Sequence, residues 1–247
     1  MTHRIRSLAF NLLFFGGSLF FSIALLWTLL LPQAKCFAVI RKIYFPYLDF
    51  IEKYVLGLDL KIEGLEHLPA DGAFILAAKH QSAYETLKLF TFLKEPAIVL
   101  KRELTWIPLW GWYPLRMGMI AIDRGSATEA MSSILKGAQR VKKEGRPIVI
   151  FPQGTRVAPG VDRPYRGGIA KIYKETGLTV VPMALNSGVF WGRNAFWKKS
   201  GTVTFRILPP IAADLPPQEM MDRLKTVLER ESDTLVDDAR KQENQKT

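Results

Sequence analysis

One long apolar segment near the N-terminus restricts the folds open to this chain. Residues 8–31 include no charged side chain. The run exceeds the roughly 20 residues that a helix needs to cross a bilayer. Arg4 and Arg6 precede it, and Lys35 and Arg41 follow it. Because basic residues flank both ends, the positive-inside rule does not fix an orientation. The segment predicts a membrane anchor.

Two other interpretations of this segment stay open. A secretory signal peptide is one, but the apolar core is longer than usual, and residues 32–35, Pro-Gln-Ala-Lys, form a poor cleavage site. The other is a shallower insertion. Asn11 and the Gly16-Gly17-Ser18 tripeptide interrupt the run, and a second apolar and aromatic stretch covers residues 36–58. Two helices can therefore either span the bilayer or form a hairpin within one leaflet.

Composition limits the remaining function classes. A chain of 247 residues with 48% hydrophobic residues can bury one substantial core, which suggests one domain or at most two. The net charge of +11, from 34 basic and 23 acidic residues, favours an anionic partner. Nucleic acid is the weakest such partner, because the sequence shows no recognised nucleic-acid-binding motif and does contain a predicted membrane segment. Cys36 as the single cysteine excludes an intrachain disulfide, and three histidines at scattered positions predict no zinc site.

Short apolar runs alternate with amphipathic segments after the anchor. We predict strands at residues 58–62, 73–78, 147–150, 178–185 and 202–208. We predict helices at residues 127–143, at 168–176 with Gly177 as the stop, and from the Pro216-Pro217 pair onward. Strands that alternate with helices indicate an α/β fold, with a mixed, mostly parallel sheet flanked by helices.

Two predicted strands lead directly into polar loops. His80 and Glu85 follow residues 73–78, and residues 151–156, Phe-Pro-Gln-Gly-Thr-Arg, follow residues 147–150. Open α/β sheets present their chemistry at such strand ends. His80 suits a general base, with Glu85 holding its tautomer. Glu85 also fits a helix capping box with Ser82 at the N-cap, so both roles stay open.

Four sequence blocks together resemble a known family. The two loops are the first two blocks. The other two are residues 118–124, Gly-Met-Ile-Ala-Ile-Asp-Arg, and residues 181–186, Val-Pro-Met-Ala-Leu-Asn. In this order and spacing the blocks resemble the glycerolipid acyltransferase superfamily, and most closely its 1-acylglycerol-3-phosphate acyltransferases. Glu85 stands where that family usually has Asp, and Gln153 where it usually has Glu. Gln153 keeps the size of Glu without its charge, which leaves Arg156 freer to meet a phosphate.

The resemblance implies a reaction and a set of residues. We expect a fatty acyl group to pass from acyl-CoA or acyl carrier protein to the sn-2 hydroxyl of lysophosphatidate, giving phosphatidate. His80 is the expected base and Glu85 its partner. No acyl-enzyme is expected, because the chain has no Gly-x-Ser-x-Gly elbow and its only thiol lies beside the anchor. The expected phosphate-binding residues are Lys101, Arg124, Gln153, Gly154, Thr155 and Arg156, and the expected acyl or donor pocket residues are Pro182 and Asn186. Neither a metal nor an organic cofactor is implied.

The resemblance also implies a domain organisation for the whole chain. We expect a membrane anchor at residues 1–57, an acyltransferase catalytic domain of the glycerol-3-phosphate acyltransferase type at 58–240, and a polar tail at 241–247. The implied location is a bacterial inner membrane, with the catalytic domain on the cytoplasmic side. Aromatic clusters at 105–114 and 190–199 suit either the headgroup level of the bilayer or ordinary packing. Two alternatives stay open: acylation of another lyso-lipid such as lyso-ornithine lipid, and a non-catalytic lipid-binding relative.

Overall fold

A mixed sheet forms the centre of the molecule. The computed structural model describes residues 3–123 and 127–244, and within them seven strands pair in the order β1-β7-β6-β2-β5-β3-β4. Only β6 and β7 pair in antiparallel fashion. This arrangement confirms the predicted fold class. The strands are β1 (Leu58–Glu63), β2 (Ile75–Ala78), β3 (Ala97–Lys101), β4 (Ile120–Ile122), β5 (Ile148–Ile150), β6 (Val180–Leu185) and β7 (Gly201–Ile207).

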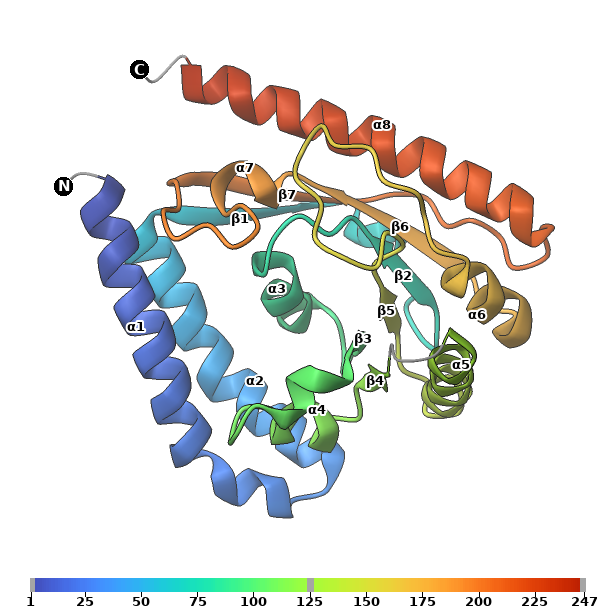
Figure 1. The fold of residues 1–247 in the computed structure, drawn as a ribbon, viewed down its shortest axis with the longest axis horizontal. Helices are drawn as coiled ribbons and strands as arrows, with labels where there is room; N and C mark the ends of the chain where they lie inside the picture. Colours follow the sequence, from blue (N-terminus) through green and yellow to red (C-terminus); the bar gives the residue numbers. More distant parts are fainter. Residues whose placement is uncertain (1–2, 124–126, 245–247) are drawn as a thin grey trace.

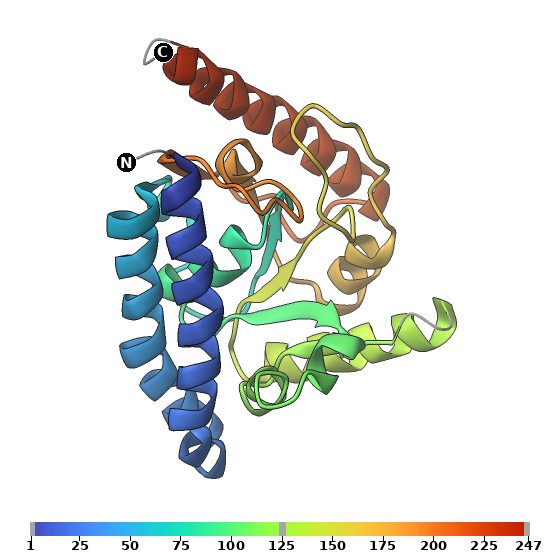
Figure 2. The same ribbon diagram turned by 60° about the vertical axis from the view of Figure 1, so that its left-hand side comes forward.

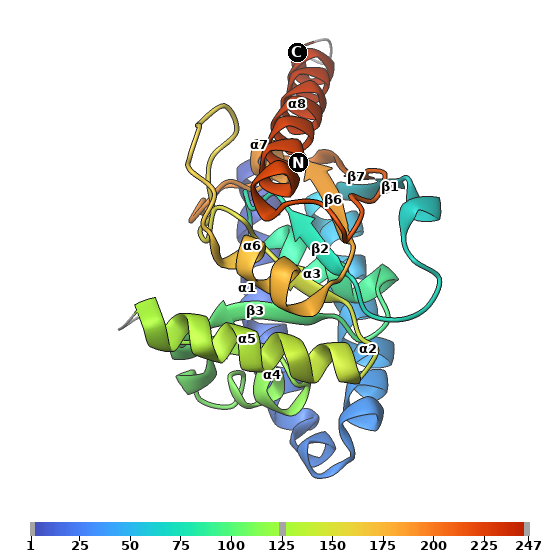
Figure 3. The same cartoon turned by 90° about the vertical axis from the view of Figure 1, so that its right-hand side faces the viewer.

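Helices cover both faces of this sheet (Figures 1 and 3). One face packs against α5 (Ala127–Lys143), α6 (Gly168–Thr176) and α8 (Pro217–Asn244). The other face packs against α3 (Tyr84–Phe92) and, beyond it, α1 (His3–Ala24), α2 (Gln33–Phe50) and α4 (Trp112–Arg116). A short α7 (Ser187–Phe190) follows β6. Single helical turns complete the chain at Leu26–Leu30, Ile51–Leu56, Leu65–His67 and Arg102–Trp106.

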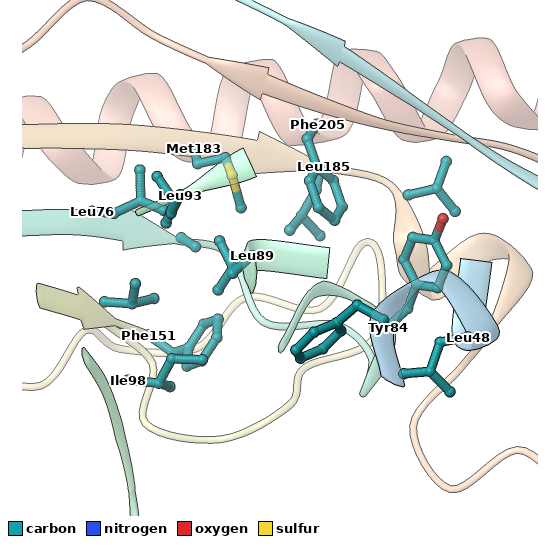
Figure 4. Close-up of a cluster of buried hydrophobic side chains, with 14 of the residues drawn as sticks. Leu48, Leu76, Tyr84, Leu89, Leu93, Ile98, Phe151, Met183, Leu185 and Phe205 are labelled. Carbon is teal, nitrogen blue, oxygen red and sulfur yellow. The ribbon is translucent and has the colours of Figure 1, made fainter. Parts of the chain in front are cut away.

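The alternation of side chains along the strands produces two separate cores. In β2, Ile75 and Ala77 pack toward α5, α6 and α8, whereas Leu76 and Ala78 pack toward α3 and the N-terminal helices. Figure 4 shows the second core, in which Leu76 lies near the α3 side chains. Since layers cover both faces, β2 is buried along its whole length. This explains why the strand is a continuous apolar run in the sequence rather than an alternating one.

The helical boundaries follow the local sequence signals. The predicted helices at 127–143 and 168–176 are confirmed residue for residue as α5 and α6. Gly177 ends α6 with a φ of 61°, a left-handed conformation that glycine adopts without a Cβ penalty. The C-terminal helix α8 continues to Asn244, so its last turn occupies part of the segment predicted as a polar tail.

The N-terminal helices α1 and α2 lie side by side as an antiparallel hairpin (Figures 1 and 2). Within the described residues, α1 is the one helix long and apolar enough to cross a membrane. Two of its polar residues face the rest of the protein: Ser7 Oγ donates to the Lys198 carbonyl (2.8 Å), and Asn11 Nδ2 to the Phe196 carbonyl (3.0 Å). The opposite face is exposed and apolar, with Ile5, Leu8, Leu12, Phe15, Leu19, Phe20 and Ile23.

Candidate active site

The two polar loops predicted from the sequence meet at one edge of the sheet. Strands β2 and β5 are parallel neighbours, with Ala77 opposite Ile150, so their carboxyl ends lie together. The His80 ring stacks on the Phe151 ring, with centroids 4.0 Å apart and planes inclined by 18°. The Val157 N–H donates to the His80 carbonyl at 2.7 Å. The loop after β5 therefore supports both the ring and the backbone of His80.

Glu85 is the hub of a hydrogen-bond network around His80. Its Oε1 accepts from His80 Nδ1 (2.8 Å) and from the backbone N–H groups of Gln81 (2.8 Å) and Ser82 (2.7 Å). Its Oε2 accepts from Ser187 Oγ at 2.7 Å. Glu85 is 0% exposed. An ionised carboxyl group only accepts hydrogen bonds, so these donors match it. With Nδ1 engaged, Nε2 is the ring nitrogen that remains for substrate.

Glu85 contacts both His80 and the backbone just before α3. The Tyr84 N–H donates to Ser82 Oγ at 3.1 Å, and the Ser82 N–H donates back to Glu85 Oε1. Only half of the predicted capping box forms, because Ser82 Oγ accepts from the Tyr84 N–H rather than from the Glu85 N–H, and Ala83 rather than Ser82 is the N-cap of α3. The same carboxylate oxygen also holds His80. The additional methylene of Glu relative to Asp is accommodated because the side chain curls back over the first turn of its own helix.

Ser187 was not predicted from the sequence. It lies 102 residues from Glu85 and contacts it only because β6 ends beside β2. The next residue, Gly188, donates its N–H to Gln81 Oε1 at 2.9 Å. A Cβ at Gly188 would lie 2.9 Å from Gln81 Cβ, so only glycine allows this approach. The position directly after the block at 181–186 was the only sequence signal for Ser187.

A cavity of about 1000 Å³ opens beside His80. The polarity of its lining depends on which segment of the chain contributes the residues. Loops and strand ends contribute polar residues, among them His80, Lys101, Gly154, Thr155 and Arg156. The N-terminal hairpin and the helices beside it contribute apolar side chains, including Phe21, Leu25, Phe45, Phe90, Tyr113 and Met119. A single chamber therefore offers a base, cationic groups and room for an apolar chain, and its size is at the upper end of ordinary ligand pockets.

The cavity is cationic. Its basic residues are Lys101, Arg156, Arg166, Lys171 and Arg193, and none of its lining residues within the described chain is Asp or Glu. Asp162 is the first acidic residue after Arg156 in the sequence, and so the nearest candidate along the chain for an ion pair with it. Asp162 instead lies 3.7 Å from Lys225 Nζ, measured to its Oδ1. The Arg156 guanidinium is therefore left to face the cavity.

Three predicted pocket residues lie elsewhere. Gln153 is 1% exposed and does not line the cavity, and its side-chain amide has no hydrogen-bond partner among the described residues. Pro182 lies within β6, covered on both faces. Asn186 accepts from the Thr204 N–H (2.8 Å) and donates to the Leu235 carbonyl (3.2 Å). These three side chains therefore lie within the protein rather than along the lining of the cavity.

Arg124, the remaining predicted phosphate ligand, lies outside the described residues. The strand that precedes it, β4, ends at Ile122 at the edge of the sheet, and Ile122 lines the cavity.

Comparisons with known proteins agree with this geometry. The family model described as Acyltransferase matches residues 59–186, slightly more than half of the chain. The 1-acyl-sn-glycerol-3-phosphate acyltransferase of Pseudomonas aeruginosa is 32% identical over 215 residues, covering 85% of this chain and 82% of that protein. The yeast (Saccharomyces cerevisiae) protein of the same name is 28% identical over 199 residues, covering 76% and 62%.

A solved structure gives the same result for the fold. The 1-acyl-sn-glycerophosphate acyltransferase of Thermotoga maritima superposes with a TM-score of 0.76 at 21% identity, over 94% of this chain and 97% of that one. The fold and site thus define an acyltransferase. The chain belongs to the acyltransferase family, and within it to the 1-acylglycerol-3-phosphate acyltransferase group that the four sequence blocks indicated.

Proposed function

We propose that this enzyme transfers a fatty acyl group from acyl-CoA or acyl carrier protein to the sn-2 hydroxyl of 1-acylglycerol-3-phosphate, giving phosphatidate. The observation that carries the proposal is the His80 Nδ1 to Glu85 Oε1 hydrogen bond at a cavity with both cationic and apolar lining. Relatives that carry this activity in their names support the same acceptor. A lysophosphatidate molecule has both features that such a cavity accommodates, a phosphate and an acyl chain.

The proposed chemistry is a direct transfer. His80 Nε2 removes the proton from the acceptor hydroxyl as its oxygen attacks the carbonyl carbon of the thioester. The carbon–sulfur bond then breaks, and the departing thiolate takes the proton back from the imidazolium. Glu85 stabilises the imidazolium and holds the ring in place. Cys36 is buried between the N-terminal helices and does not line the cavity, so it is not in position to act as a nucleophile.

The acceptor phosphate is proposed to bind at the loop after β5. The planar guanidinium of Arg156 meets phosphate oxygens through paired, parallel hydrogen bonds. Gly154, with a φ of 67°, allows the tight turn that brings this loop to the cavity. Thr155 adds a hydroxyl, and Lys101 adds a second cation from the end of β3. Arg124 remains part of this proposed set.

The N-terminal hairpin is proposed to lie in one leaflet rather than to span the bilayer. The start of α1 is bonded to the segment 196–198, and its later residues Ser18, Phe21 and Ser22 line the cavity. A helix that contacts the catalytic domain along its length cannot cross the membrane apart from that domain. Its exposed apolar face can still enter the acyl region. We place residues 1–57 as anchor and 58–240 as catalytic domain, on the cytoplasmic side of a bacterial inner membrane.

An acceptor competition assay tests this function. Purified enzyme in mixed micelles is given equal amounts of lysophosphatidate, lysophosphatidylethanolamine and lyso-ornithine lipid with one labelled thioester, and the products are separated. We expect labelled phosphatidate to dominate, and Arg156→Gln to raise the KM for lysophosphatidate. Label found only in an aminolipid product would overturn the proposed acceptor.

A further inference from the structure

Three arginines from separate segments converge on the loop after β5. Arg156 belongs to this loop. The Arg166 backbone N–H donates to the Pro152 carbonyl at 2.8 Å, and the Arg166 side chain crosses Gly154 so closely that a Cβ there would lie 2.7 Å from Arg166 Cδ. Arg193 Nη1 donates to the Arg156 carbonyl at 3.3 Å. The fold therefore holds Arg166 and Arg193 beside Arg156 by contacts to the same short loop.

These arginines lack the partners that would explain them structurally. All three line the cavity, and within residues 3–123 and 127–244 no ion pair joins them to a carboxylate. Like charges gathered in a cleft repel one another and raise the local concentration of anions. Such a cluster is stable when a counter-anion binds it. Its arrangement is that of a binding site for anionic groups.

One acceptor phosphate does not account for the whole cluster. In the proposed function, Arg156 already serves the phosphate of lysophosphatidate, and a guanidinium pairs with phosphate in a bidentate manner. Arg166 and Arg193 remain, and both are exposed at the surface. The apolar part of the cavity lining, which the N-terminal hairpin contributes, accommodates the acyl chains. The second anion therefore approaches from the aqueous side, as a water-soluble acyl donor does.

We infer that Arg166 and Arg193 form a donor subsite that binds the phosphate of the 4′-phosphopantetheine arm. This arm is common to acyl-CoA and acyl carrier protein, so one subsite serves either donor. The inference rests on the proposed acyl transfer but not on the identity of the acceptor. It assigns two residues outside the four sequence blocks to substrate binding.

The test uses donors that differ only in this phosphate. Initial rates are measured with S-acyl-4′-phosphopantetheine and with S-acyl-pantetheine, for wild type, for Arg166→Gln/Arg193→Gln and for Arg163→Gln. Arg163 is exposed in the same segment but does not line the cavity, which makes it a matched control. A charged hydrogen bond contributes a factor of about ten or more. We expect wild type and Arg163→Gln to prefer the phosphorylated donor by about tenfold or more, and the double variant to lose this preference.

Two outcomes would overturn the subsite. One is a wild-type enzyme that does not distinguish the two donors, and the other is a double variant that keeps the preference. If the double variant keeps the preference and also shows a raised KM for lysophosphatidate, this second outcome would move both arginines to the acceptor side. Arg193→Gln alone gives the same comparison if the double variant folds poorly.

A binding measurement separates this inference from the acceptor assignment. Free CoA is titrated calorimetrically into detergent-solubilised enzyme without any acceptor present. We expect the double variant to bind CoA about tenfold or more weakly than Arg163→Gln does. This loss would hold even if the acceptor is another lyso-lipid, whereas equal CoA affinity in both variants would count against the subsite.

Discussion

Replacing Glu85 with Gln isolates the charge at the centre of the site. The Oε1 position accepts from two backbone N–H groups and from His80 Nδ1, so the amide oxygen must occupy it. The amide NH₂ then takes the Oε2 position and donates to Ser187 Oγ, which can turn to accept. The variant keeps the hydrogen-bond pattern and the His80 tautomer. It loses only the negative charge.

The size of the effect follows from this geometry. At 2.8 Å, a carboxylate and an imidazolium attract each other by about 6 kcal/mol at an effective dielectric constant of 20. Removing one partner of a buried pair typically costs about 3–5 kcal/mol. Because His80 is charged only after it accepts the proton, this loss falls on the transition state. At about 1.4 kcal/mol for each factor of ten, kcat should fall about 100- to 4000-fold.

The assay separates kcat from KM at saturating donor and acceptor. We expect the KM values for both substrates to change little, since Glu85 is fully buried and does not line the cavity. Ser187→Ala serves as the graded control. It removes one hydrogen bond to the carboxylate but keeps the negative charge beside His80, so it should lower kcat less than Glu85→Gln does. A Glu85→Gln enzyme that folds normally and keeps wild-type kcat would refute the assigned role of the carboxylate.

Two further predictions concern other parts of the structure. Gly154→Ala places a Cβ against the Arg166 side chain at a φ of 67°, and we expect it to lower both kcat/KM and Tm. Gly160→Ala is the control, because its φ of 81° is similarly strained but no atom lies within 4 Å of the added Cβ, so its effects should be smaller. Burial lowers the pKa of Lys198 from 10.5 to about 8. Between these values the unfolded state binds more protons, so folding stability should rise with pH from about 8 to 10.5. Urea unfolding of Lys198→Met should lack this rise, and an unchanged slope would contradict the shift.

The architecture could be predicted from the sequence where local signals are strong. The helix α5 shows a clear 3.6-residue period, and Gly177 marks the end of α6, so both boundaries are confirmed. Apolar runs located β1, β2, β5, β6 and β7 but not β3 and β4, and the polar endings of β2 and β5 located His80 and the 151–156 loop. The pairing of β2 with β5 then brings these two motifs together, as expected for neighbouring parallel strands.

Contacts between distant segments could not be predicted in the same way. The Ser187 to Glu85 hydrogen bond depends on β6 lying beside β2, which no local pattern encodes. Gln153 belongs to a polar motif, yet it is buried behind the loop that carries it. Asn186 also belongs to a motif, but it joins β7 to α8 instead of contacting the cavity. Motif membership predicted where the candidate site lies, and tertiary packing decided which of the motif side chains line its cavity.

The central claim is that His80 acts as the base of an acyl transfer to lysophosphatidate. The most direct measurement is the transfer of labelled acyl groups from acyl-CoA and from acyl carrier protein to lysophosphatidate, with wild type and His80→Ala compared in membranes at equal expression. The account predicts labelled phosphatidate with wild type and its loss in His80→Ala. Equal phosphatidate formation by both proteins would contradict the claim, as would its absence from wild type with either donor.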